Sequence, residues 1–157
     1  MPAREQIQYL TFSLTQGNID SFIGAEISTG LIPADGMALD LVSIEMDISS
    51  TTLAGVGKAY FDLELTKNPE TQLLGLDDPD NLISIASRLF TTSSTAGTGF
   101  MTFPLKKVIT EELLVVSSTV NLGFDSLNFS NPLTVTGRIG YTTKKMKEVD
   151  ILRILQG

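Results

Sequence analysis

Apolar and polar residues alternate with a period of two over most of the chain, as in half-buried β-strands. In residues 58–66, for example, Phe61 and Leu63 alternate with Asp62 and Glu64, so we expect one buried and one wet face. Gly, Pro, Asn and Asp separate segments of this kind. The predicted strands span residues 6–15, 21–28, 39–48, 58–66, 81–90, 100–109, 113–124 and 133–141.

Three of these segments depart from simple alternation. In 39–48 the pattern slips at Leu41–Val42, which indicates a β-bulge or burial on both faces. The apolar spacing of 81–90 also suits a helix. Pro104 interrupts 100–109, so this segment should be an edge strand or a broken one.

Near the C-terminus the apolar residues no longer alternate with polar ones but recur every three to four positions. Met146, Val149, Leu152 and Leu155 recur at helical spacing and predict a helix over about 146–155. A helix of about ten residues is marginal in isolation, so its apolar face must pack on something. The chain's own strands and a second copy of the protein are the two candidates.

Short strands separated by turns favour an all-β architecture over parallel α/β, which would need several intervening helices. We expect a single domain spanning 1–157, an eight-stranded antiparallel β-sandwich of the jelly-roll type, with 144–157 as a basic, amphipathic helical tail. An immunoglobulin-like sandwich is the alternative, although its Cys and Trp signature is absent. Segments 29–37 and 89–100 are predicted to be a turn and a mobile surface loop.

Composition removes several kinds of chemistry. The chain has no cysteine and no histidine, which excludes disulfides, thiol nucleophiles, Cys/His zinc sites and imidazole acid–base catalysis. No apolar run approaches the roughly 20 residues of a membrane span, and the start of the chain lacks a signal-peptide core. We therefore expect a soluble, unprocessed protein with no membrane span.

The net charge of −7 is unevenly distributed. Residues 1–57 carry −6, residues 58–105 carry −3, and residues 106–157 carry +2. Only the last third could attract an anionic partner, and its basic cluster is Lys144, Lys145 and Lys147. These lysines could contact nucleic acid or an acidic partner, but the acidic domain argues against a wide nucleic-acid footprint, and local charge balance is the alternative.

Candidate catalytic groups reduce to pairs of carboxylates on strands. Asp62 and Glu64, and likewise Glu45 and Asp47, stand two residues apart and so share a strand face, about 7 Å apart. That spacing overlaps the separation of glycosidase carboxylates, but such pairs are also ordinary solubilising residues. We expect no enzyme activity and no cofactor.

The segment LDDPDN offers oxygen ligands within a few residues. Asp77, Asp78 and Asp80 are weak calcium candidates, most plausible where a neighbouring subunit completes the coordination shell. A proline-centred turn explains the same residues, because Asp side chains accept hydrogen bonds from their own backbone.

Three stretches, QIQYLTFSLT, TGLIPADGMALDLVSIEMDI and LTVTGRIGYTTKKMKEVDILRIL, occur in an order that resembles single jelly-roll coat proteins of small icosahedral viruses. The resemblance is one of pattern over most of the chain. It implies two four-stranded sheets, copies packed into a closed shell, and no enzyme activity. The chain departs from many such proteins because Arg4 is the only base before the first strand. Another protein, a polyamine or an internal membrane would then have to neutralise the charge of the genome. The alternative is that this chain is not the main shell protein.

These observations predict a structural virion protein, a self-assembling capsid subunit that is put together in the host cytoplasm. Its partners would be other copies of itself, with another virion protein as a further candidate. The expected subunit interface is Met146, Val149, Leu152 and Leu155. The alternative function is a trimeric spike, fibre or receptor-binding β-sandwich.

Overall fold

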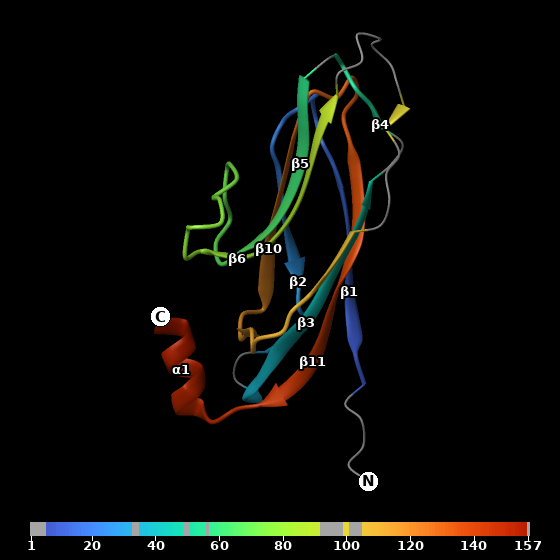
Figure 1. The fold of residues 1–157 in the computed structure, drawn as a ribbon. Coiled ribbons are helices and arrows are strands. Elements are labelled where there is room, and N and C mark those ends of the chain that lie inside the picture. The colour runs from blue at the N-terminus through green and yellow to red at the C-terminus, as the bar shows by residue number, and fades with distance from the viewer. Residues whose placement is uncertain are drawn as a thin grey trace.

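Two antiparallel sheets face each other as a sandwich, and a short helix lies beside one end of it (Figure 1). The computed structural model describes residues 6–32, 35–48, 51–55, 57–91, 99–100 and 105–156. The elements are β1 (Gln8–Thr15), β2 (Ile23–Ser28), β3 (Met37–Ile48), β4 (Thr51–Thr52), β5 (Gly57–Thr66), β6 (Asn81–Thr91), β7 (Gly99–Phe100), β8 (Leu105–Val108), β9 (Leu114–Val115), β10 (Thr119–Leu127), β11 (Thr134–Lys145) and α1 (Glu148–Gln156).

The strand order is that of a jelly roll. One sheet runs β1-β11-β3-β8 and the other runs β2-β10-β5-β6, so each sheet combines strands from both halves of the chain. The predicted fold class is confirmed, with one small difference. The two-residue strand β9 also pairs with β3, so the two sheets hold nine described strands rather than eight.

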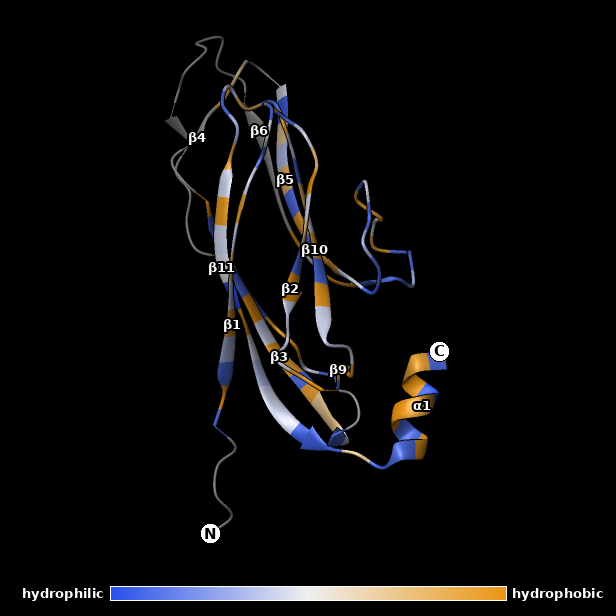
Figure 2. Ribbon diagram, turned by 180° about the vertical axis from the view of Figure 1, so that it is seen from behind, coloured by the Kyte–Doolittle hydropathy of each residue, from blue (hydrophilic) through white to orange (hydrophobic). Residues whose placement is uncertain are grey.

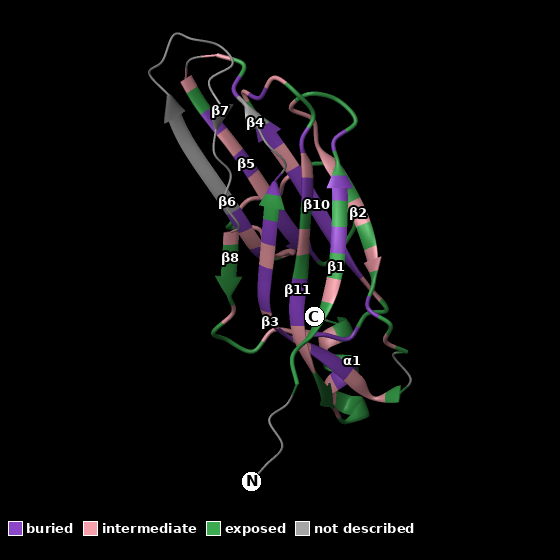
Figure 3. Ribbon diagram, turned by 90° about the vertical axis from the view of Figure 1, so that its right-hand side faces the viewer, coloured by how far each residue is buried: buried purple, intermediate pink, exposed green. Residues whose placement is uncertain are grey.

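The core fills the space between the two sheets (Figure 3). Ile44, Leu63, Phe124 and Ile139 are fully buried there, two from each sheet. They stand on the faces that the period-two alternation marked as apolar, because successive side chains of a strand point to opposite faces.

The irregularity predicted in the third strand is a β-bulge. Ser43 faces Gly140 and Leu41 faces Tyr141, so Val42 is the extra residue on β3. The carbonyl of Val42 instead accepts a hydrogen bond from the amide of Ile109 at 2.9 Å.

Two ambiguous segments are also settled. Residues 81–90 are extended in β6, not helical, and β6 continues to Thr91, so the start of the loop predicted at 89–100 is strand. Segment 100–109 contributes β8, which is an edge strand as predicted. Pro104 and residues 92–98 lie outside the described residues.

The predicted strand 113–124 is wrong as a single element. It splits into β9 in one sheet and β10 in the other. Between them, Ser117 and Ser118 expose carbonyls that accept hydrogen bonds from the Thr29 hydroxyl and amide, at 2.8 and 2.9 Å. The chain therefore crosses between the sheets at the polar residues Ser117 and Ser118, which separate two apolar runs.

The outer face of β5 is not wet at its C-terminal end, contrary to the alternation in its sequence, although Lys58 is exposed and Asp62 half-buried on the same face. Glu64 is only 4% exposed. Its carboxylate accepts hydrogen bonds from the Leu74 amide at 2.8 Å, the Gly75 amide at 3.0 Å and the Asn81 side-chain amide at 3.2 Å. Glu64 thus fastens the segment between β5 and β6 onto the sheet.

Candidate assembly surface

The helix α1 follows the last strand after a two-residue link. The Met146 amide donates to the Gly36 carbonyl at 2.8 Å, which ties the link to the segment before β3. Gly36 has a φ of 67°, a conformation that favours glycine. The Lys147 carbonyl then accepts from the Asp150 and Ile151 amides at 3.0 and 3.2 Å, and the helix begins.

The charges of α1 suit the helix dipole. Glu148 and Asp150 lie in the first turn and Arg153 in the last. The helix starts at Glu148, two residues later than predicted, because β11 is longer than its sequence pattern indicates. Lys144 and Lys145 belong to this strand and pair with Ala38 and Met37 of β3, so they are not part of the helix.

One side of α1 packs on the chain's own sandwich. Ile151 is 6% exposed and lies in a small apolar cluster with Ala38 and Val116, separate from the main core. Leu114, Met146 and Ile154 are half-buried around it. Packing on the same chain, one of the two alternatives left open by the sequence, is therefore what holds the helix.

Apolar residues recur along α1 (Figure 2), and several of them have side chains exposed to water. Val149 is 60% exposed, Leu152 48% and Leu155 56%, and we call these three residues the outer stripe. Val149 and Leu152 line a shallow hollow together with Arg153 and Gln156. Three of the four residues predicted as a subunit interface are thus about half exposed, whereas Met146 lies against its own domain. Of the three, Leu155 stands nearest the sandwich, because it lines a second hollow with Ile154 and Val116.

The predicted basic cluster is partly neutralised. Lys144 forms an ion pair with Glu112. Lys145 and Lys147 are exposed, and neither forms an ion pair within the described residues. Two free lysines next to Glu148 make a small footprint, far from the broad basic surface typical of nucleic-acid binding.

Of the predicted carboxylate pairs, the one on β3 takes part in ion pairs across the sheet. Glu45 contacts Arg138 at 3.1 Å and Lys106 at 3.3 Å, and the Arg138 guanidinium also lies 4.2 Å from the ring centre of Tyr9. The hydrogen bond from Arg138, aided by Lys106, holds the pKa of the Glu45 carboxyl below its ordinary value. In the other pair Glu64 is buried and fully engaged with the segment above it, so neither pair is arranged as two open carboxylates.

The aspartates of LDDPDN form a turn. The Asp78 side chain accepts from the Asp80 amide at 2.9 Å, and the Asp78 carbonyl accepts from the Asn81 amide at 3.1 Å. Asp77 is exposed nearby. Among the residues that the structure describes, no three Asp or Glu side chains come together as a metal site would require.

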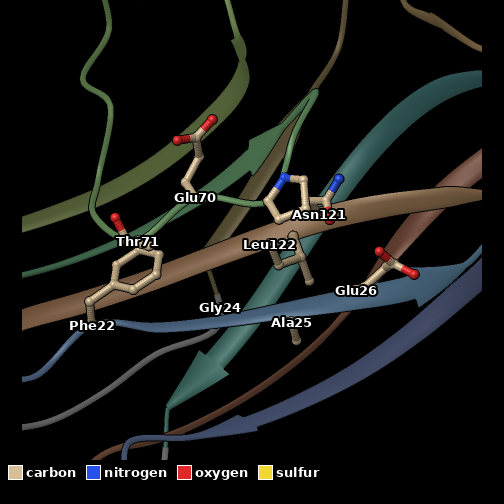
Figure 4. A pocket seen from close by; sticks show the side chains of 9 residues that line it. Phe22, Gly24, Ala25, Glu26, Glu70, Thr71, Asn121 and Leu122 are labelled. Carbon is tan, nitrogen blue, oxygen red and sulfur yellow. The ribbon is translucent and has the colours of Figure 1, made fainter.

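A hollow of about 400 Å³ on the outer side of β2 and β10 was missed by reasoning from the sequence (Figure 4). Gly24 lines it, and Gly123, which faces Gly24 across the two strands, lies under the Phe22 ring at its side. Two glycines a hundred residues apart carry no local signal, and only knowledge of the register could have brought them together.

No protein-family model matches the chain, and none of the curated proteins matches its sequence. Within the described part of the chain, no helix has the length and apolar character needed to cross a membrane.

Proposed function

We propose that this protein is a structural subunit of a viral or virus-like shell, in which jelly-roll sandwiches form the wall and α1 contributes to the contact between copies. On this proposal it is a virion component, its principal partners are copies of itself, and it has no enzyme activity. The observation that carries the proposal is the outer stripe of α1.

The outer stripe is more apolar than the attachment of α1 requires. Ile151 and Ile154 of the helix, with Met146 of the link before it, already provide the apolar contact with the sandwich. Val149, Leu152 and Leu155 still leave about half of their surface exposed. Covering what remains of each would contribute about 1 kcal/mol, half the value for burying a whole Leu or Val. A partner surface would provide that gain.

The stripe is part of a contact and not the whole of one. A helix of nine residues is about 13 Å long, whereas a stable interface covers about 800 Å² on each partner. Side-by-side packing of sandwiches supplies further area. Tyr9 is 43% exposed on the edge strand β1 and stacks on Arg138. Tyr and Arg are enriched among the residues that contribute most of the binding energy at interfaces, so this pair is a candidate for that further contact.

The first experiment measures the mass of the purified, tag-free protein by light scattering, with negative-stain images of the same fraction. Particles of tens of copies or more are the expected result. A discrete trimer would instead favour the spike, fibre or receptor-binding sandwich, and a monomer at high concentration would contradict self-assembly.

The contribution of the stripe is tested by replacing Val149, Leu152 and Leu155 together with serine. We expect a folded sandwich that no longer forms particles. The matched control replaces Arg153 and Gln156 with serine on the same helix, which lowers helix propensity without removing apolar surface. Particles from both variants would contradict the role of the stripe.

A truncation tests the same point independently. It should remove residues 148–157 and leave 144–147 in place, because Lys144 and Lys145 pair with β3. A shorter chain that still unfolds cooperatively but stays monomeric is the expected outcome, and unchanged particles would contradict it.

A further inference from the structure

The hollow beside β2 is created by missing side chains. Gly24 of the edge strand β2 lies directly opposite Gly123 of β10 on the outer face of the sheet. The Phe22 ring lies over Gly123, so close that a Cβ there would be 2.8 Å from a ring carbon. Over Gly24 there is little spare room: an added Cβ would stand 3.3 Å from the Phe22 ring and 3.4 Å from the Glu70 carbonyl, both tight contacts. Gly123 thus gives the Phe22 ring its place, and the ring and Gly24 line a hollow of about 400 Å³.

The lining combines an apolar floor with hydrogen-bond acceptors. Phe22, Ala25 and Pro69 provide the apolar part. Figure 4 shows Phe22 and Thr71 at one end and Glu26 at the other, with the Glu70 carboxylate above. A bare metal ion would not suit a site of this kind, because much of its wall offers no oxygen.

The inner wall contains a polar group without a partner. Asn121 is 6% exposed, and its Nδ2 donates to the Lys67 carbonyl at 3.3 Å. Its Oδ1 is buried and accepts no hydrogen bond within the described residues. Buried acceptors are normally satisfied, so this oxygen calls for a donor. Neither Glu26 nor Glu70 forms an ion pair with a described residue.

We propose that this hollow binds a primary alkylammonium group, with the alkyl chain on Phe22 and Pro69 and the ammonium hydrogens directed to the carboxylates and Asn121. The lining fits this class because its charged groups are all anionic and its unpaired group is an acceptor, whereas an ammonium supplies three donors and no acceptor. The ammonium could belong to a free amine or to a lysine side chain of another protein.

Isothermal titration calorimetry of the full chain tests this, because it works whatever the state of assembly. The probes are n-pentylamine and, to imitate a lysine in a protein, Nα-acetyl-lysine methylamide; 1-pentanol and pentanoate are the neutral and anionic controls. Saturable binding of at least one amine, with no saturation by pentanol or pentanoate, is expected. Tighter binding of the blocked lysine would identify a protein source, and tighter binding of pentylamine a free amine.

Variants locate the site. Glu70→Gln should weaken binding about threefold and the Glu26→Gln, Glu70→Gln pair about tenfold, since each removes a charge-assisted hydrogen bond. Gly24→Val should abolish binding by filling the space. Glu111→Gln, an exposed glutamate outside the hollow, should leave the affinity unchanged. The proposal is overturned if neither amine binds, if pentanol binds equally well, or if the paired variant binds as the natural chain does.

Discussion

The main core and the cluster beneath α1 differ greatly in how many buried apolar residues they contain. Between the sheets, twenty-two buried apolar residues of the described chain form one continuous core. Beneath the helix, the buried set is Ala38, Val116 and Ile151. A nine-residue helix held by so few contacts is near the limit of what can stay ordered. The sandwich should therefore be stable without α1. The exposed apolar residues of α1 should then serve contact with a partner and not the stability of the sandwich.

The largest effect should come from emptying the main core. Phe124 is fully buried in the middle of β10, so Phe124→Ala leaves a cavity that rigid sheets on both sides cannot close. We expect a loss of about 3–5 kcal/mol in the free energy of unfolding. Urea denaturation followed by circular dichroism measures it. A loss below about 2 kcal/mol would mean that the core is more plastic than the comparison assumes.

The next effect should come from the buried carboxylate of the sandwich. Glu64→Leu keeps the bulk of the side chain but leaves the Leu74 and Gly75 amides without their acceptor. The Asn81 side-chain amide loses its bond to Glu64 but keeps the Gly75 carbonyl and the Ser84 hydroxyl as acceptors. We expect a loss of about 3 kcal/mol, since buried donors without partners are costly. Amide hydrogen exchange should accelerate between β5 and β6.

A matched substitution separates this effect from a change of charge. Glu26 is exposed on the edge strand β2, and Glu26→Leu should change stability by less than about 0.5 kcal/mol. Equal losses from the two glutamates would show that the Glu64 hydrogen bonds contribute little.

The sequence predicted which strand faces form the core of the sandwich, but it did not predict which polar residues on the other faces are buried. Alternation along β5 correctly placed Phe61 and Leu63 in the core, because a buried sheet face imposes its period on the residues. The same alternation made Glu64 look solvated, since a carboxylate under a covering segment and one in water have identical sequence patterns. What covers a strand is decided by residues elsewhere in the chain.

The candidate surfaces show the same limit. Helical spacing found Val149, Leu152 and Leu155, because a stripe is a local property of one element. It could not show that Met146 faces inward, which depends on where β11 ends. The hollow over Gly24 depends on the register of two strands distant in sequence, so its site residues were not predictable.

A smaller effect should follow from loosening the helix. Ile151→Ala removes most of the buried apolar contact of α1 with Ala38 and Val116. Because the helix can detach while the sheets stay folded, we expect the global free energy of unfolding to fall by about 1 kcal/mol or less. Hydrogen exchange within residues 148–156 should rise strongly, with the sheets unaffected.

Leu152→Ala is the control for the helix. Leu152 is 48% exposed on the outer stripe, so its truncation should leave exchange in α1 nearly unchanged in the isolated subunit. If Ile151→Ala instead destabilised the sheets as much as Phe124→Ala, the helix would be an integral part of the core and the comparison would fail.

The smallest effect concerns charge on the outer face of the sandwich. Burial, with Asp20 and Asp62 nearby, raises the pKa of the Asp125 carboxyl, although a hydrogen bond from the Ser126 amide partly offsets this. A raised pKa means that the folded state binds the proton more tightly than the unfolded one. Stability should therefore fall as pH rises from the ordinary Asp range through the folded pKa. Asp125→Asn keeps an acceptor for Ser126, and at pH 7 it should gain about 0.5 kcal/mol, a value that allows for solvent screening.

Glu45 provides a test of opposite sign on the other sheet. Its pKa is lowered by Arg138 and Lys106, so its contribution is present above the ordinary Glu pKa and is lost as pH falls through the folded pKa. Glu45→Gln should therefore destabilise the protein at pH 7 and make no difference at pH 2.5, whereas the gain from Asp125→Asn disappears in acid. Denaturation midpoints at both pH values measure the two differences. Shifts of the same sign in both variants would mean that overall charge, and not these local contacts, controls the stability of the sandwich.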